Sequence, residues 1–278
     1  MGHPPTRRPG RPAPLAAGAV LAAAALPWAG CAGGGGADTS IVADLVDAAA
    51  APTPGEAARD AFDTYDADAR RRAVSRLAGA PFGGEAPYLK LYRLLLDDPD
   101  PTVRAAAIRA LAQHGQPRDA PAIAATLEDE NDFLQWEAAK ALQRLHHPEV
   151  VGALIRVVVE ADDVDVRMAA ARALGQYPQP RVFDVLVGAL DDVDYGVVQA
   201  AADSLRTLTG RDFGRDGRAW LAWGRAHRQS LFDQGGVFTY RPYAQPPGVL
   251  DRLILDRVMF WRGKEPPESR VPAGLDAS

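Results

Sequence analysis

The stretch DDPDPTVRAAAIRALAQ, residues 97–113, decides the fold of this chain. Asp100 can cap a helix, and Pro101 suits the first helical position because its missing N–H would have no partner there. Apolar residues then recur at helical spacing along one face, and most of them are alanine. Such a face packs closely against neighbours but is too small to form a core alone. The stretch therefore predicts a helix that needs further copies of itself.

The copies occur at nearly regular spacing. The pattern of residues 107–111 (AIRAL) recurs at 138–142, 170–174 and 201–205, and in weaker form at 73–77. An acidic loop precedes each copy, and an apolar helical segment precedes each loop. A two-helix unit with a period of about 32 residues is typical of an α-solenoid. The leucine that ends each pattern should be buried between successive repeats: Leu111, Leu142, Leu174 and Leu205.

Two blocks carry a resemblance to a known family. The segments DPDPTVRAAAIRALA (98–112) and DVDVRMAAARALG (163–175) closely resemble HEAT-like repeats of the phycobilisome-lyase type. The resemblance covers about residues 56–228 and is specific for fold only, because enzymes, scaffolds and adaptors share this repeat. It implies an all-α fold: a right-handed α-solenoid of about five HEAT-like two-helix repeats, with a capping helix and an irregular C-terminal extension. It also implies that the second helix of each repeat lines a concave surface.

The acidic loops have a structural interpretation. Aspartate or asparagine stands directly before each second helix, where its side chain can cap the free N–H groups. A calcium site is the alternative, but the twelve-residue loop with a central glycine is missing. Arg104 and Arg167, which follow the start of their helices, are expected to pair with acids of a neighbouring repeat.

The N-terminus resembles an export signal. Three arginines precede a small apolar run at 15–26, which is too short to span a bilayer as a mature helix. Small residues then precede Cys31, the only cysteine, as in a bacterial lipoprotein signal peptide that is cleaved before a lipidated cysteine. Trp28 departs from the Leu-like residue usual there. An ordinary secretory signal, an Ala-rich segment with Cys31 incidental, and twin-arginine export through Arg7-Arg8 remain alternatives.

Four regions follow from this pattern. Residues 1–30 are a lipoprotein-type signal peptide, and 31–55 are a Gly-rich tether with a short helix. Residues 56–228 are the solenoid with a terminal cap that includes Trp220 and Trp223. Residues 229–278 are a partly disordered extension, with a helical apolar stripe at 250–261 and disorder expected over 264–278.

Composition excludes several classes of function. The formal net charge is −5, and the charged residues of 1–30 are all basic, so the body is more acidic still. An acidic body disfavours non-specific nucleic-acid binding, which depends on phosphate neutralisation. One cysteine permits no intramolecular disulfide. The spacing indicates no catalytic grouping, metal site or cofactor, and the adjacent His146 and His147 would point apart on a helix.

One pattern of charge suggests a binding surface. Ala105, Arg109 and Ala112 mark the face of their helix that is predicted to lie opposite the apolar one. The positions equivalent to Arg109 hold Lys140 and Arg172 in the next repeats, and those equivalent to Ala105 hold Trp136 and Met168. These five residues predict a basic row on the concave surface that binds an anionic or extended partner: Arg109, Lys140, Arg172, Trp136 and Met168. The alternative is an ordinary solvated helix face.

These features favour a non-catalytic function. We expect an exported scaffold or adaptor that presents the basic row to a protein partner in the cell envelope. Lipid at Cys31 would hold it to a membrane, facing the periplasm, and Ala32 favours the outer membrane over the inner one by resemblance to known sorting behaviour. A chromophore-lyase-like maturation factor and a binder of a small anionic ligand are the alternatives. The sequence indicates neither the partner nor the oligomeric state.

Overall fold

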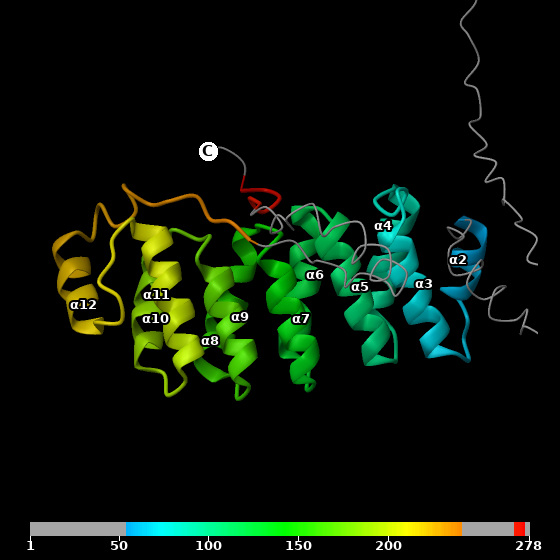
Figure 1. Ribbon diagram of the computed structural model, residues 1–278, viewed down its shortest axis with the longest axis horizontal. Coiled ribbons are helices and arrows are strands. Elements are labelled where there is room, and N and C mark those ends of the chain that lie inside the picture. Colours follow the sequence, from blue (N-terminus) through cyan, green and yellow to red (C-terminus); the bar gives the residue numbers. More distant parts are fainter. Residues whose placement is uncertain (1–53, 241–269, 276–278) are drawn as a thin grey trace, which may run out of the picture. The chain divides into compact units, whose positions relative to one another are not determined.

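A computed structural model describes residues 54–240 and 270–275 of the chain (Figure 1). The predicted signal peptide, nearly all of the tether and the apolar stripe at 250–261 lie outside these residues. Within the described part the chain is helical, and its β-structure is limited to two isolated bridges. No helix there combines the length and the apolar character needed to cross a bilayer.

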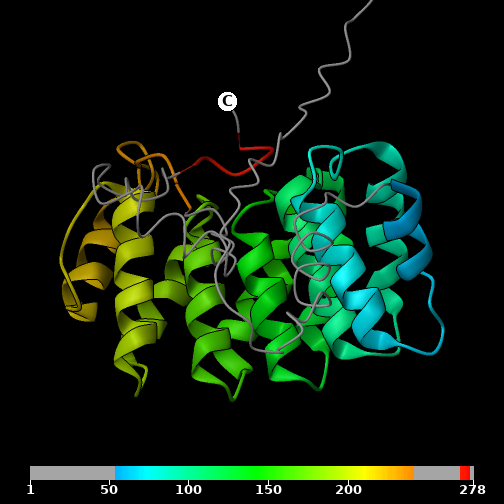
Figure 2. The ribbon, with the colours of Figure 1, turned by 45° about the vertical axis from the view of Figure 1, so that its right-hand side comes forward.

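The helices form two layers built from pairs. The first helices of the pairs are α2 (Pro54–Asp60), α4 (Ala86–Leu94), α6 (Ala120–Ala125), α8 (Val151–Glu160) and α10 (Pro180–Gly188). The second helices are α3 (Ala67–Gly79), α5 (Pro101–His114), α7 (Asp132–Leu142), α9 (Val164–Leu174) and α11 (Tyr195–Thr209). Each second helix packs on the first helix of its own pair, and the second helices pack in sequence, α3 on α5, α5 on α7, α7 on α9 and α9 on α11 (Figures 1 and 2). This arrangement confirms the predicted α-solenoid of two-helix repeats.

Side-chain caps begin all five second helices. In each, a backbone N–H in the first turn of the helix donates to the side-chain oxygen of the residue that precedes the helix. This confirms that these acidic loops serve as caps. The capping bonds join Asp66 to Ala69 (2.9 Å), Asp100 to Thr102 (2.8 Å), Asn131 to Phe133 (3.0 Å), Asp163 to Val166 (3.0 Å) and Asp194 to Gly196 (3.4 Å). Each such cap contributes about 1 kcal/mol to stability.

The structure confirms the predicted alignment of the repeats on their buried leucines. Leu111, Leu142, Leu174 and Leu205 are fully buried, and so is Leu77 in the weaker first copy. The alanines around them let neighbouring second helices approach closely, and the core runs without interruption from the first repeat to the last.

The same close packing overturns one prediction. Ala105 and Ala112 are buried rather than exposed, because α5 is enclosed by α3, α4 and α7 and so buries more than one face.

The last repeat is covered by α12 (Gly217–Ala226), which packs on α10. Trp220 is fully buried there and meets the ring of Phe213 edge-on at a centroid distance of 4.9 Å. The approach of α12 is close at Gly224, where an added Cβ would lie 2.6 Å from Phe183 Cε1. An aromatic cluster therefore closes the apolar edge that a further repeat would otherwise cover.

A short C-terminal segment returns to the middle of the solenoid. The N–H of Ala273 donates to Arg144 O at 2.8 Å, and the N–H of His146 donates to Ala273 O at 2.8 Å. Arg270 exchanges two backbone hydrogen bonds with Tyr240. The prediction of disorder over 264–278 is therefore wrong for residues 270–275, since these backbone groups are paired and Ala273 packs against the core.

Candidate functional site

Arginines on the second helices form a first array of charges, which we call the arginine ladder. Each arginine stands seven residues before the buried leucine of its helix and reaches an aspartate that stands two residues before the next capping residue. The pairs are Arg70–Asp98 (2.8 Å), Arg104–Asp129 (3.1 Å) and Arg167–Asp192 (2.9 Å). The ladder confirms the pairing expected for Arg104 and Arg167 and adds Arg70, which the sequence analysis missed.

The ladder also organises the loops between repeats. Asp98 accepts a backbone hydrogen bond from the capping residue Asp100 at 2.9 Å while it pairs with Arg70. Burial alone would raise the pKa of Asp192, but the hydrogen bonds from Arg167 and from the backbone of Asp194 lower it below its usual value. These charges are satisfied within the protein, so the ladder stabilises the stacking of repeats and is not a candidate binding site.

The three cations of the basic row each stand two residues before the buried leucine of α5, α7 or α9. Its first member, Arg109, donates from Nη1 to Glu137 Oε1 of the next repeat at 2.5 Å. Glu137 is only 2% exposed, although it lies on the same helix as two residues of the row. The sequence pattern does not single out Glu137, because a glutamate among alanines on an amphipathic helix normally belongs to the solvated face.

Lys140 occupies the centre of the row. Its Nζ lies 4.0 Å from the centroid of the Trp136 ring, within the range of a cation–π contact. Burial is the main cause that lowers the pKa of the Lys140 ammonium, Glu137 opposes the shift, and the nearby Arg109 and Arg172 add to it. The structure thus brings the three predicted cations and Trp136 into one electrostatic cluster.

The two residues on α9 differ from each other. Arg172 is exposed, and it makes no hydrogen bond or ion pair with the described residues. Met168 is half-buried and packs against the core, facing α11, where an added Cβ on Gly196 would lie 3.2 Å from its sulfur. Met168 therefore contributes mainly to packing, while Arg172 and the half-buried Trp136 remain accessible to a partner.

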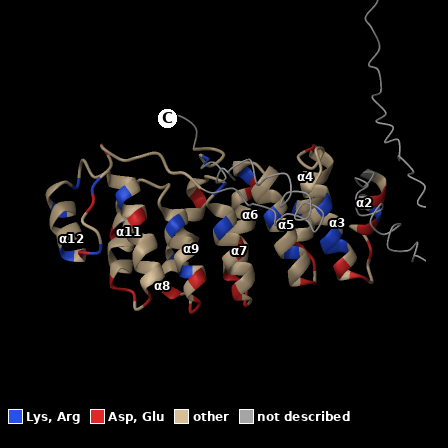
Figure 3. Ribbon diagram, in the orientation of Figure 1, with Lys and Arg blue, Asp and Glu red and all other residues tan. Residues whose placement is uncertain are grey.

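Acidic residues concentrate at one end of the second helices. In Figure 3 they gather where these helices begin, at the lower ends of α3, α5, α7 and α9 in that view. In the row itself, the three cations lie near the carboxylate of Glu137, which pairs with Arg109. The row therefore gathers three positive charges in an otherwise acidic protein.

No candidate metal centre competes with the row in the described part of the chain. There, no three histidine, cysteine, aspartate or glutamate side chains gather as metal ligands would. His146 stacks on Tyr177 at a centroid distance of 4.6 Å, and burial lowers the pKa of its imidazole. His147 caps a short turn by accepting from the Glu149 N–H at 3.4 Å. Both histidines thus have contacts that account for their positions.

The comparisons with known proteins concern the repeats. The sequence pattern of HEAT repeats matches residues 55–134 and 121–206, together more than half of the chain. None of the proteins with curated descriptions matches.

Similar solved structures are engineered repeat proteins. An engineered protein from a structural genomics consortium is 23% identical, with a TM-score of 0.44 over 54% of this chain and 76% of its own. A designed armadillo repeat protein is 16% identical, with a TM-score of 0.43 over 59% of this chain and 89% of its own. Likeness at this level carries no argument about function. The family assignment rests on the matched repeats, and by that match the chain belongs to the HEAT-repeat family.

Proposed function

We propose that this protein is an exported, lipid-anchored scaffold whose basic row binds an acidic segment of a protein partner in the cell envelope. Solenoids of stacked helices typically serve as extended binding surfaces and rarely as enzymes. The observation that carries the proposal is the gathering of Arg109, Lys140 and exposed Arg172 around the half-buried ring of Trp136.

The geometry of the row suits an extended acidic chain. Arg109 is held by Glu137, and Lys140 is held over Trp136, so two of the cations are pre-oriented and lose little side-chain freedom on binding. Arg172 projects freely one repeat further on. Aromatic and arginine side chains are favoured at the centres of protein interfaces, which supports the row as the point of contact.

A direct test replaces the exposed end of the row. Arg172→Glu should weaken binding of a fluorescein-labelled, glutamate-rich peptide severalfold, measured by anisotropy, and the loss should be larger at low salt because screening is then least. Arg218→Glu on α12 is the matched control, since Arg218 is also exposed and makes no ion pair with a described residue. Equal binding by both variants and the wild type would mean that the row is only a solvated helix face.

The anchor is proposed from the sequence alone. Cys31 follows a short apolar run and small residues, and a lipidated cysteine with two acyl signals gives stable attachment where one does not. The wild type should sediment with membranes and partition into detergent, with the outer membrane favoured by Ala32. Cys31→Ser should be soluble or unprocessed. Identical soluble behaviour of the two proteins would remove the lipid anchor from the proposal and leave the row untouched.

A further inference from the structure

The arginine ladder is interrupted at one interface, between α7 and α9. Gln135 stands seven residues before Leu142, where α3, α5 and α9 have the ladder arginine. Ala161 stands two residues before the cap Asp163, where the loops before α5, α7 and α11 have the ladder aspartate. Both members of the pair are therefore replaced at the same interface, although the residues around them keep the repeat pattern.

Gln135 makes the first contact of a ladder arginine but does not reach the next repeat. Its Nε2 donates to Asp129 O at 2.6 Å, as Arg104 Nη1 donates to Asp98 O at 3.0 Å and Arg167 Nη1 to Ala161 O at 2.9 Å. The arginines continue beyond that carbonyl to the next repeat, whereas the glutamine side chain ends there.

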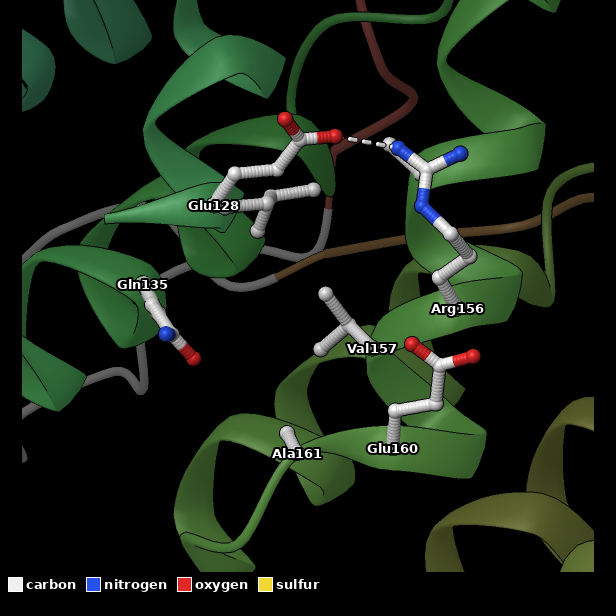
Figure 4. A pocket seen from close by; sticks show the side chains of 8 residues that line it. Glu128, Gln135, Arg156, Val157, Glu160 and Ala161 are labelled. Atoms are coloured by element: carbon white, nitrogen blue, oxygen red, sulfur yellow. Dashed lines mark hydrogen bonds and ion pairs between the residues drawn. The ribbon is translucent and has the colours of Figure 1, made fainter. Parts of the chain in front are cut away.

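An open cleft of about 200 Å³ lies at the interrupted interface (Figure 4). Gln135 and Ala161 form part of its wall, and Leu127, Ala153 and Val157 supply apolar surface. The volume is below the roughly 300–1,000 Å³ usual for sites of small-molecule ligands, so the cleft suits a single long side chain.

The charges at the cleft favour a cation. Glu128 pairs with Arg156 across its mouth, as the dashed line in Figure 4 marks. Glu160 also lines the cleft, is exposed, and makes no ion pair with a residue of the described part. Two carboxylates and one guanidinium leave one net negative charge beside an apolar wall.

We infer that this cleft receives the side chain of an arginine from a partner protein, in the position that an internal arginine fills at three other interfaces of the same chain. The methylene stem would lie along Val157 and Leu127, and the guanidinium would donate to Glu160 and to the Gln135 side-chain oxygen. The cleft is built from α8 and the ends of its neighbours, whereas the basic row lies on second helices. Binding here is therefore independent of the proposed function.

The inference is tested with small probes on the full-length protein in detergent. Saturation-transfer NMR with N-acetyl-L-arginine methylamide should give saturable binding, and the uncharged citrulline analogue should bind at least about tenfold more weakly, because it loses the charge-assisted hydrogen bonds. The lysine analogue should also bind more weakly, since it lacks the planar fork. Equal binding of all three probes, or no saturable binding, would overturn the inference.

Variants then locate the binding. Gln135→Arg with Ala161→Asp restores the ladder pair, so it should fill the cleft and abolish the arginine signal. Glu160→Gln should weaken binding about tenfold, while Glu149→Gln, at an exposed acid in the short turn that precedes α8, should leave it unchanged. If circular dichroism shows that the double variant does not fold, the comparison of Glu160→Gln with Glu149→Gln still tests the inference. Arginine binding that survives both the restored pair and Glu160→Gln would place the site elsewhere.

Discussion

The arginine ladder and the basic row lie on the same second helices, yet their charges are used differently. In the ladder each cation has its own carboxylate in the next repeat, and the Arg70–Asp98 side chains are only 10% and 5% exposed. In the row, Arg109 pairs with Glu137, whereas exposed Arg172 makes no ion pair with a described residue. The comparison shows that a charged position on a solenoid is structural where the next repeat supplies its partner, and that a charge such as Arg172 stays exposed where no described residue does so.

The helix geometry separates the two arrays. The ladder position precedes the row position by five residues, which is about 140° around the helix axis. The ladder side chains therefore lie at the edge where the capped loops of adjacent repeats meet. The row side chains lie on another part of the second-helix surface, and a substitution in one array should leave the other largely unaffected.

Lowering the pH should have the largest effect on the free energy of unfolding, because it protonates all the structural carboxylates together. Asp119 pairs with Arg93 at 2.6 Å, and the pKa of Asp119 is lowered. Burial is the largest single cause and opposes the shift, but the hydrogen bonds from Arg93 and from the Gln116 backbone, together with the nearby positive charges, outweigh it. The pKa of Asp192 is lowered in the same way. The unfolded chain therefore takes up protons first, so this stability is fully present above about pH 5 and is lost as the pH falls through about 4 and below.

The measurement is urea denaturation between pH 7 and pH 3. The midpoint should fall with pH, and the fall should be smaller in an Asp192→Asn variant, which has no proton to take up at that position. A midpoint independent of pH would contradict the structural role of these carboxylates.

Asp98→Ala should have the largest effect of the single substitutions. It leaves the Arg70 guanidinium buried without its carboxylate, which typically costs about 3–5 kcal/mol of unfolding free energy. Asp129→Ala is the matched comparison within the ladder. Its pair with Arg104 is 21% and 25% exposed, so water can replace the lost partner and about 1–2 kcal/mol is expected. Equal losses in chemical denaturation would mean that burial does not set the strength of the ladder.

Much of this structure is predictable because it depends on local and repeated features. The caps need only an aspartate or asparagine before an apolar pattern, and Leu142 must be buried if its equivalents are. Glu137 is not predictable in this way, because its burial depends on how α7 is turned against α5. The sequence places Ala105 on the face opposite the apolar one for the same reason: a single helical stripe does not reveal how many neighbours a helix has. Gln135 and Ala161 become meaningful only once the ladder has been seen in the structure.

Restoring the ladder pair at the interrupted interface should raise the unfolding free energy, by less than Asp98→Ala lowers it. Gln135→Arg with Ala161→Asp adds one partly exposed ion pair and fills the cleft, so a gain of about 0.5–1 kcal/mol in unfolding free energy is expected. Gln135→Arg alone should give little or no gain, because the aspartate is missing. A loss of stability in the double variant would show that the interface is not equivalent to its neighbours.

The smallest effect on stability is expected in the basic row, at Arg172. Arg172→Glu removes no hydrogen bond or ion pair of the described structure, and its side chain is exposed, so the unfolding free energy should change by less than about 0.5 kcal/mol. Arg109→Glu is not equivalent, although Arg109 belongs to the same row, because Arg109 pairs with Glu137. It would place a second carboxylate against buried Glu137 and should destabilise the protein. A calorimetric melt of the two variants separates these positions: unchanged melting for Arg172→Glu and a lowered midpoint for Arg109→Glu are expected. If both lower the midpoint equally, Arg172 belongs with the structural charges of the ladder, and the row keeps no cation free for a partner.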